Sequence, residues 1–264
     1  MSIAVSSLIL FFLLIPGLAF RRTYFSEEFS KQYVKESFFG IFISSFVPSI
    51  FFHFFGFLIF GYYCNIIKLD VFFDILQSKP SLTSIENISE SFNWILIYNV
   101  GLFVFSSISG AFLKNLVRTK KLDRKYKFLR YQNQWHYILT GEFFDFPRAN
   151  IDLDKSSVED IEFVFVDALI EVNGTSYLYD GILVDYELSN DGGLDFIIIK
   201  NAERRKLEAD RELDDNGKRI DNIDSYYPIS GHLLILKYSE IKNINFSYYK
   251  LEEEKGSFFP KLLS

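Results

Sequence analysis

Three uncharged, largely apolar stretches dominate the first half of the 264-residue chain. Each approaches or exceeds the roughly 20 residues that a helix needs to cross a hydrocarbon core of ~30 Å. The second stretch contains Pro48, so we expect that helix to be kinked or tilted. The pattern predicts three transmembrane helices, at about residues 2–20, 38–67 and 91–113.

The first stretch is also open to interpretation as a secretory signal peptide. Signal peptides carry positive charge before the apolar run, whereas Arg21 and Arg22 follow it here. No small-x-small cleavage motif precedes these arginines. The flanks therefore favour a retained membrane anchor.

The second half of the chain has the alternation of polar and apolar residues that is typical of strands. Residues 162–171 alternate with period two, and Asn173-Gly174 then supplies the turn that a tight hairpin requires. Gly181 interrupts the next strand, where we expect a bulge or sharp bend. Five short antiparallel strands with a bent second strand predict a small barrel over residues 158–250, followed by a tail of residues 251–264. The predicted strands are residues 162–171, 176–188, 194–200, 232–238 and 241–246.

Charge is divided unevenly between the two halves. Residues 1–141 hold 14 Lys/Arg against 8 Asp/Glu, a net charge of +6, while residues 142–264 hold 14 against 26, a net charge of −12. Loops rich in Lys/Arg remain in the cytoplasm, and here they are residues 21–36 and 114–130. The bias predicts a multi-pass protein of the bacterial inner (plasma) membrane, with its N-terminus outside and its C-terminal domain in the cytoplasm. The single cysteine, Cys64, excludes a disulfide framework.

Eight cations follow the third predicted span, which we expect to continue as a juxtamembrane helix over residues 114–141. Such a basic collar favours contact with anionic lipid. Nucleic acid is the competing ligand, but the adjoining bilayer and the acidic domain argue against it. The residues assigned to lipid contact are Lys114, Arg118, Lys120, Lys121, Arg124, Lys125, Lys127 and Arg130.

Two features inside the spans concern packing. Ser106 with Gly110, and Ser107 with Ala111, have the four-residue spacing of small residues that lets membrane helices approach closely. His53 is the one ionisable side chain deep in a span, and such residues are functional candidates. A neutral histidine bonded to a neighbouring carbonyl is the interpretation that we favour for it.

The chain lacks the patterns on which catalysis depends. Its three histidines have no metal-binding spacing, and there is no phosphate-binding glycine loop or nucleophile turn. We therefore expect a protein that is not an enzyme and that needs no cofactor and no metal.

Three segments carry a resemblance to known proteins. They are IPGLAFRRTYFSEEFSKQY (Ile15–Tyr33), QWHYIL (Gln134–Leu139) and VDALIEVNGTSYLYDGILVDYELS (Val166–Ser189). Together they resemble a group of uncharacterised bacterial inner-membrane proteins that have an N-terminal Pro-Gly and Arg-Arg span and a C-terminal Sm-like or SH3-like barrel. The resemblance implies a barrel of about 90 residues and a role in an antiphage system. The loop signatures of RNA-binding Sm proteins are missing, so RNA binding is not implied.

The fold class expected is thus a three-helix membrane region followed by a small all-β barrel that is Sm-like or SH3-like. We expect a homo-oligomeric, non-enzymatic protein whose barrel senses or docks a soluble cytoplasmic partner. The alternative is a channel or membrane-disrupting effector gated through the barrel. Ser106, Ser107 and Ser109 favour a pore, whereas the Phe-rich second span favours a sealed bundle.

Overall fold

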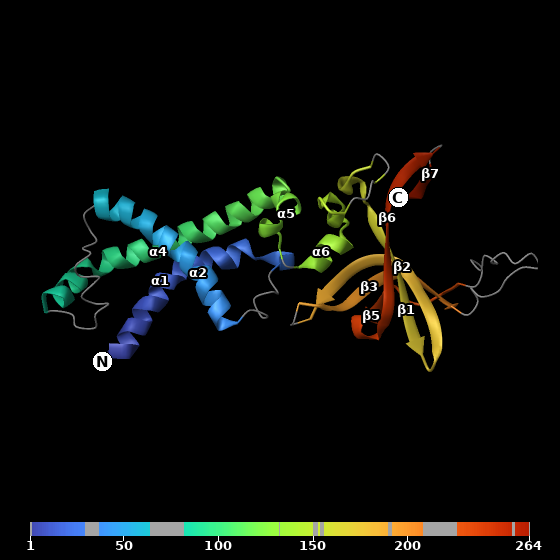
Figure 1. Ribbon diagram of the computed structural model, residues 1–264, viewed down its shortest axis with the longest axis horizontal. Helices are drawn as coiled ribbons and strands as arrows, with labels where there is room; N and C mark the ends of the chain where they lie inside the picture. Colours follow the sequence, from blue (N-terminus) through green and yellow to red (C-terminus); the bar gives the residue numbers. More distant parts are fainter. Residues whose placement is uncertain are drawn as a thin grey trace, which may run out of the picture. The chain divides into compact units, whose positions relative to one another are not determined.

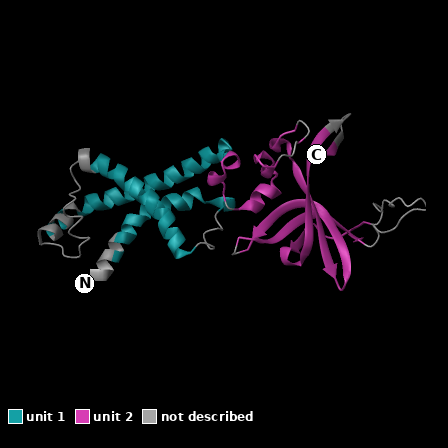
Figure 2. Ribbon diagram, in the orientation of Figure 1, with its two compact units in different colours: residues 1–122 teal, residues 123–264 magenta. Residues whose placement is uncertain are grey.

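The computed structural model falls into two compact units, residues 1–122 and 123–264 (Figure 2). Each unit is described by itself. The residues that the structure describes are 2–29, 37–63, 82–131, 133–149, 153, 156–189, 192–207, 226–254 and 257–263.

The first unit consists of three long helices, α1 (Ser2–Tyr24), α2 (Phe38–Phe57) and α4 (Leu82–Thr119). A π-helical turn, η2 (Leu58–Tyr63), extends α2. Helix α1 packs against both α2 and α4, and the three helices cross near their middles (Figure 1).

Two of these helices are long and apolar enough to cross a membrane, at Phe38–Phe60 and Phe92–Thr119. Only 22% and 17% of their most apolar stretches are buried within the protein, whereas the core helix of a soluble protein is mostly buried. Large apolar side chains such as Phe54, Ile108 and Phe112 are more than half exposed. The first predicted span coincides with α1, and its crossing of the membrane remains a prediction.

The second unit begins with a connector of short helical turns. These are α5 (Leu122–Lys125), η3 (Lys127–Leu129), α6 (Gln134–Leu139), η4 (Glu142–Asp145) and η5 (Val158–Asp160). The continuous helix predicted over residues 114–141 is therefore wrong, because α4 ends at Thr119. Lys121 adopts a left-handed conformation with φ +52°, which stops the helix.

The connector leads into a curled antiparallel sheet. Its strands are β1 (Phe163–Val172), β2 (Thr175–Leu188), β3 (Leu194–Lys206), β4 (Tyr227–Pro228), β5 (Leu234–Lys237), β6 (Ile241–Glu254) and β7 (Ser257–Leu262). Their order is β4-β3-β2-β1-β6-β7, and β5 pairs with β3. A 3₁₀ turn, η8 (Tyr238–Glu240), connects β5 to β6. The described pairings form a half-barrel (Figure 1).

The β1–β2 hairpin confirms the prediction from the Asn173-Gly174 turn. Both residues have positive φ, +52° and +80°, and the register centres on them. Gly181 marks the predicted irregularity, because the β2–β3 register shifts between Asp180 and Ile182. A Cβ at Gly181 would press on the carbonyl of Lys200. The glycine therefore allows the close approach of two strands where the sheet bends.

The sheet extends beyond its predicted C-terminal boundary. Strand β6 runs to Glu254 rather than residue 246, and the predicted tail contributes β7. Glu252 makes 2.9 Å ion pairs with Lys250 on its own strand and Lys261 on β7, which link the final hairpin. The period-two pattern is masked there by three consecutive glutamates.

The core of this unit lies on one face of the sheet. Val166, Ala168 and Ile170 alternate inward from β1 and meet Ile197 and Ile199 from β3. Helix α6 covers this core, because Leu139 is part of the cluster and Trp135 packs against it. The QWHYIL segment thus belongs to the sheet unit rather than to a membrane helix.

Candidate functional site

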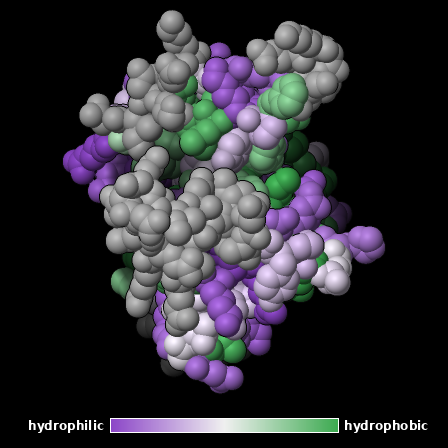
Figure 3. Space-filling model, turned by 90° about the vertical axis from the view of Figure 1, so that its right-hand side faces the viewer, coloured by the Kyte–Doolittle hydropathy of each residue, from purple (hydrophilic) through white to green (hydrophobic). Residues whose placement is uncertain are grey.

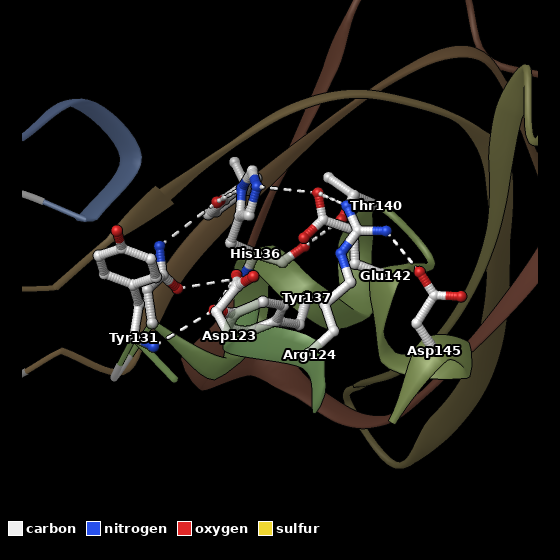
Figure 4. A network of polar contacts seen from close by, with 10 residues as sticks. Asp123, Arg124, Tyr131, His136, Tyr137, Thr140, Glu142 and Asp145 are labelled. Carbon is white, nitrogen blue, oxygen red and sulfur yellow. Dashed lines mark hydrogen bonds and ion pairs between the residues drawn. The ribbon is translucent and has the colours of Figure 1, made fainter. Parts of the chain in front are cut away.

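A network of polar contacts holds the connector together (Figure 4). Arg124 lies at one end, where its guanidinium is 2.6 Å from Asp145 Oδ2 and 3.1 Å from Glu142 Oε1. The side chains of Arg124 and Glu142 are each 11% exposed. A charge pair with so little access to water requires both partners to remain in place.

Asp123 and Tyr137 form the centre of the network. The hydroxyl of Tyr137 donates to Asp123 Oδ2 at 2.8 Å and accepts from the N–H of Tyr131 at 3.2 Å. All three side chains are essentially buried. The network therefore joins the start of the connector to α6, 14 residues later.

His136 and Asn133 extend the network to the sheet. Asn133 caps α6, because its side chain accepts from the N–H of His136 at 3.1 Å. Nδ1 of His136 lies 3.1 Å from the hydroxyl of Tyr186, a residue of β2. Tyr248 of β6 makes a second connection by donating to the carbonyl of Ile138 at 2.6 Å.

These contacts hold the connector in one conformation. The charged side chains of Asp123, Arg124 and Glu142 are buried and face intramolecular partners, while that of Asp145 is 29% exposed. Among the described residues, no group of three or more His, Cys, Asp or Glu side chains is arranged to hold a metal ion.

The eight collar cations, which the sequence assigned to lipid contact, do not form one exposed set. Besides the buried Arg124, Lys114 is 9% exposed and pairs with Glu27 at 2.7 Å. That hydrogen bond and the charge of Lys114 lower the pKa of Glu27.

Two further arginines of the collar lie over aromatic rings, Arg118 over Phe29 at 5.3 Å and Arg130 over Phe146 at 3.5 Å. The exposed side chains are those of Lys120, Lys125 and Lys127, while Lys121 is partly buried.

A Pro-Gly break in α1 organises the contacts inside the helical unit. Pro16 has no N–H, and the N–H of Gly17 donates to Ser49 Oγ at 2.9 Å. Ser49 Oγ in turn donates to the carbonyl of Leu14 at 3.1 Å. A side chain at Gly17 would collide with the backbone of Ser45, so α1 and α2 touch at this point.

His53 lies one helical turn further along α2. Its Nε2 is 3.1 Å from the carbonyl of Leu13 in α1, and its Nδ1 is 3.0 Å from the hydroxyl of Tyr98 in α4. The histidine thus has the carbonyl partner that we favoured from the sequence, and it connects all three helices. Unpaired polar groups are costly in lipid, so these contacts favour one arrangement of the helices.

The two pairs of small residues in α4 have different surroundings. Ser106 is fully buried, and a Cβ at Gly110 would meet Thr23 and the backbone of Phe20, so this pair packs on α1. Ala111 of the second pair is exposed, while Ser107 is partly exposed and bonds to the carbonyl of Phe103 in its own helix.

The sheet carries an acidic row that sequence reasoning missed. Asp180 of β2 lies opposite Asp167 of β1 and Glu203 of β3. Burial, reinforced by these two neighbouring carboxylates, raises the pKa of Asp180 to about 6. Burial also raises the pKa of Asp167, although Asn245 and Arg205 oppose that shift.

Strand β5 borders the sheet and exposes apolar side chains. It pairs with β3 on one side, and no other strand in the described part of the chain pairs with it. Leu236 points into the core, whereas Ile235 is 58% exposed, and Leu233, which lies just before the strand, is 57% exposed. Among the residues coloured in Figure 3, hydrophilic and hydrophobic areas lie side by side on the face drawn.

Comparisons of the chain with protein-family models, with curated proteins and with solved structures found no match.

Proposed function

We propose that this chain is a non-enzymatic protein of the bacterial inner membrane whose cytoplasmic sheet unit docks a soluble protein partner. Helices α1, α2 and α4 cross the bilayer in this account, with the N-terminus outside. The curled sheet forms a small Sm-like or SH3-like barrel in the cytoplasm that stays open along strand β5. A role in an antiphage system accords with the resemblance of three segments to bacterial inner-membrane proteins.

The surface of the helical unit supports its placement in a membrane. Two helices have the required length and hydropathy, and they expose large apolar side chains that lipid would cover. Helix α1 contributes the carbonyls that His53 and Ser49 bind, so it belongs to the same packed bundle.

The observation that carries the docking proposal is the edge strand β5. A strand with one paired side presents free backbone N–H and C=O groups to an incoming strand. Leu233 and Ile235 supply apolar contacts beside that edge. Addition of an extended partner segment uses both features, the backbone for affinity and the side chains for specificity.

The connector supports transmission between the two units. Its buried network joins residues 123–145 to β2, and only residues 120–122 separate this segment from the end of α4. A partner that displaces the sheet would therefore pull on α4 through a short link.

The channel alternative gains no specific support. All three serines that favoured a pore donate to carbonyls of their own helix, and Ser106 is also fully buried. The exposed pair Ser107 and Ala111 is instead suited to contact between copies in a homo-oligomer.

Site-specific photo-cross-linking in intact cells tests this proposal. A photoreactive amino acid at Ile235 of the full chain should form an adduct with a soluble protein. The same group at Val172, which is 45% exposed at the tip of the β1–β2 hairpin, is the control. Equal patterns at the two positions, or adducts only with a second copy of the chain, would contradict docking of a soluble partner at β5.

A further inference from the structure

The connector presents an aromatic tip that neither the network nor the sheet uses. Phe128 in the turn η3 is 82% exposed and Tyr126 is 43% exposed. Their ring centroids are 5.9 Å apart, so the two rings form one apolar surface. Lys125 and Lys127 are exposed beside them.

Both ends of this tip are anchored to the rest of the connector. Before it, Arg124 pairs with Glu142 and Asp145. After it, Arg130 lies 3.5 Å over the ring of Phe146, and the N–H of Tyr131 donates to Tyr137. The exposure of Phe128 is thus imposed by fixed flanking residues, rather than being that of a free chain end.

The composition of the tip matches the surface of an anionic membrane. Aromatic side chains favour the headgroup region, and lysines keep their ammonium groups at the lipid phosphates while their stems lie along apolar groups. Each Lys or Arg held near an anionic surface adds to this attraction. If the tip were surrounded by water instead, the ring of Phe128 would stay exposed to it, which is unfavourable.

The tip lies close in sequence to a candidate membrane span. Phe128 lies nine positions after Thr119, the last residue of α4. Nine residues reach at most about 30 Å when fully extended, so the tip stays within range of the surface at which α4 emerges.

We propose that residues 125–128 form a membrane-interface anchor, in which Phe128 and Tyr126 enter the headgroup region of an anionic bilayer and Lys125 and Lys127 bind lipid phosphates. This inference rests on the membrane placement in the proposed function, and it does not depend on a protein partner. The anchor consists of two aromatic and two basic residues, in place of the eight basic residues that the sequence assigned to lipid contact.

Fluorescence quenching on the full-length chain tests the anchor. Phe128→Cys is made in a Cys64→Ser background, labelled with a polarity-sensitive fluorophore and reconstituted into vesicles of phosphatidylcholine and phosphatidylglycerol. Nitroxide lipids report contact with the bilayer, and a soluble quencher reports contact with water. Ile108→Cys on the exposed face of α4 is the reference for insertion, and Val172→Cys is the control for water.

The label at position 128 should shift its emission to the blue and be quenched by nitroxide lipid, while the label at position 172 should respond only to the soluble quencher. In vesicles of phosphatidylcholine alone, or in the Lys125→Gln/Lys127→Gln variant, the quenching by nitroxide lipid at position 128 should be lost.

Two outcomes would overturn the anchor while membrane placement stands. In the first, position 108 is quenched by nitroxide lipid but position 128 responds only to the soluble quencher. In the second, position 128 is shielded from both quenchers, which would indicate a protein contact. Failure of nitroxide lipid to quench position 108 would instead contradict the membrane placement in the proposed function.

Discussion

Asp167 and Asp180 lie directly opposite each other in the β1–β2 hairpin, on adjacent antiparallel strands. Asp167 lies between the core residues Val166 and Ala168, so its side chain is on the face of the sheet away from the core. Like charges placed opposite one another on neighbouring strands destabilise a sheet. This pair therefore makes the stability of the fold sensitive to pH.

Replacing Asp180 by Asn should stabilise the protein at neutral pH. The folded state raises the pKa of Asp180 from 3.8 to about 6, so it binds the proton more tightly than the unfolded state does. The favourable contribution of the protonated group is complete below pH 3.8 and is lost as the pH rises through about 6. We expect Asp180→Asn to raise the free energy of unfolding by on the order of 1–2 kcal/mol at pH 7.5.

Denaturant unfolding in detergent, followed by circular dichroism at pH 4 and pH 7.5, measures this effect. The gain should be small at pH 4, because Asp180 is then almost fully protonated in the folded state and close to half protonated in the unfolded state, whose pKa is 3.8. Asp195→Asn, at an exposed position on β3, is the matched control and should leave the pH dependence unchanged. An equal gain at both pH values would contradict the role of Asp180.

The position of this acidic pair could have been predicted. Asp167 and Asp180 are equidistant from the Asn173-Gly174 turn, and a two-residue hairpin pairs residues that are symmetric about it. The alternation in β1 places Asp167 on the face of the strand opposite to Val166 and Ala168. The raised pKa of Asp180 was not predictable in this way, because it depends on the burial of Asp180 in the folded protein and on the charge of Glu203 in β3, outside the hairpin.

The crossing of α1 and α2 should tolerate no side chain at Gly17. Gly17→Ala places a methyl group against the carbonyl of Ser45 and the hydroxyl of Ser49. We expect a loss of about 1–3 kcal/mol, as for overpacking of a filled interior. Thermal unfolding of the full chain in detergent would measure it.

Gly101→Ala is the matched control for this substitution. Gly101 lies in α4, and a Cβ there would meet nothing within 4 Å. The control should leave the midpoint of unfolding unchanged or slightly higher, because Ala favours a helix more than Gly does. Equal destabilisation by the two substitutions would argue against the packing of α1 on α2.

The buried ion pairs of Arg124 should be essential to the connector. Arg124→Gln leaves the Glu142 carboxylate without its charged partner at a site where the side chain is 11% exposed. We expect a destabilisation of about 3 kcal/mol, the size typical of a broken buried pair. Arg148→Gln removes an exposed arginine nearby in sequence and is the control, with an expected effect close to zero.

Limited proteolysis together with denaturant unfolding distinguishes local from global effects of Arg124→Gln. The connector should become cleavable near residues 125–130 before the sheet unfolds. If Arg124→Gln and Arg148→Gln give the same proteolysis and the same unfolding, the network does not hold the connector in place.

The connector was the least predictable part of the fold. The helical spacing of apolar residues and the absence of Gly or Pro before Gly141 favoured one long helix over residues 114–141, because both signals are local. The partners of Asp123 and Arg124 lie 14 to 21 residues away, and Tyr186 lies 50 residues from His136. Contacts at such separations override helix propensity and leave little trace in local sequence patterns. The helices α2 and α4 and the first hairpin were predictable, since long apolar runs and a tight turn are local features.

The number and direction of the membrane crossings are tested most directly by labelling cysteines from outside intact bacterial spheroplasts. Three versions of the full chain carry one cysteine each: Ser2→Cys in a Cys64→Ser background, the native chain with Cys64, and Ser264→Cys in a Cys64→Ser background. A membrane-impermeant thiol reagent should label positions 2 and 64 from outside, because the Lys/Arg bias directs residues 21–36 and 114–130 to the cytoplasm. Position 264 should react only after lysis. Labelling of position 64 with protection of position 2 would show two crossings instead of three, and labelling of position 264 from outside would contradict a cytoplasmic sheet unit.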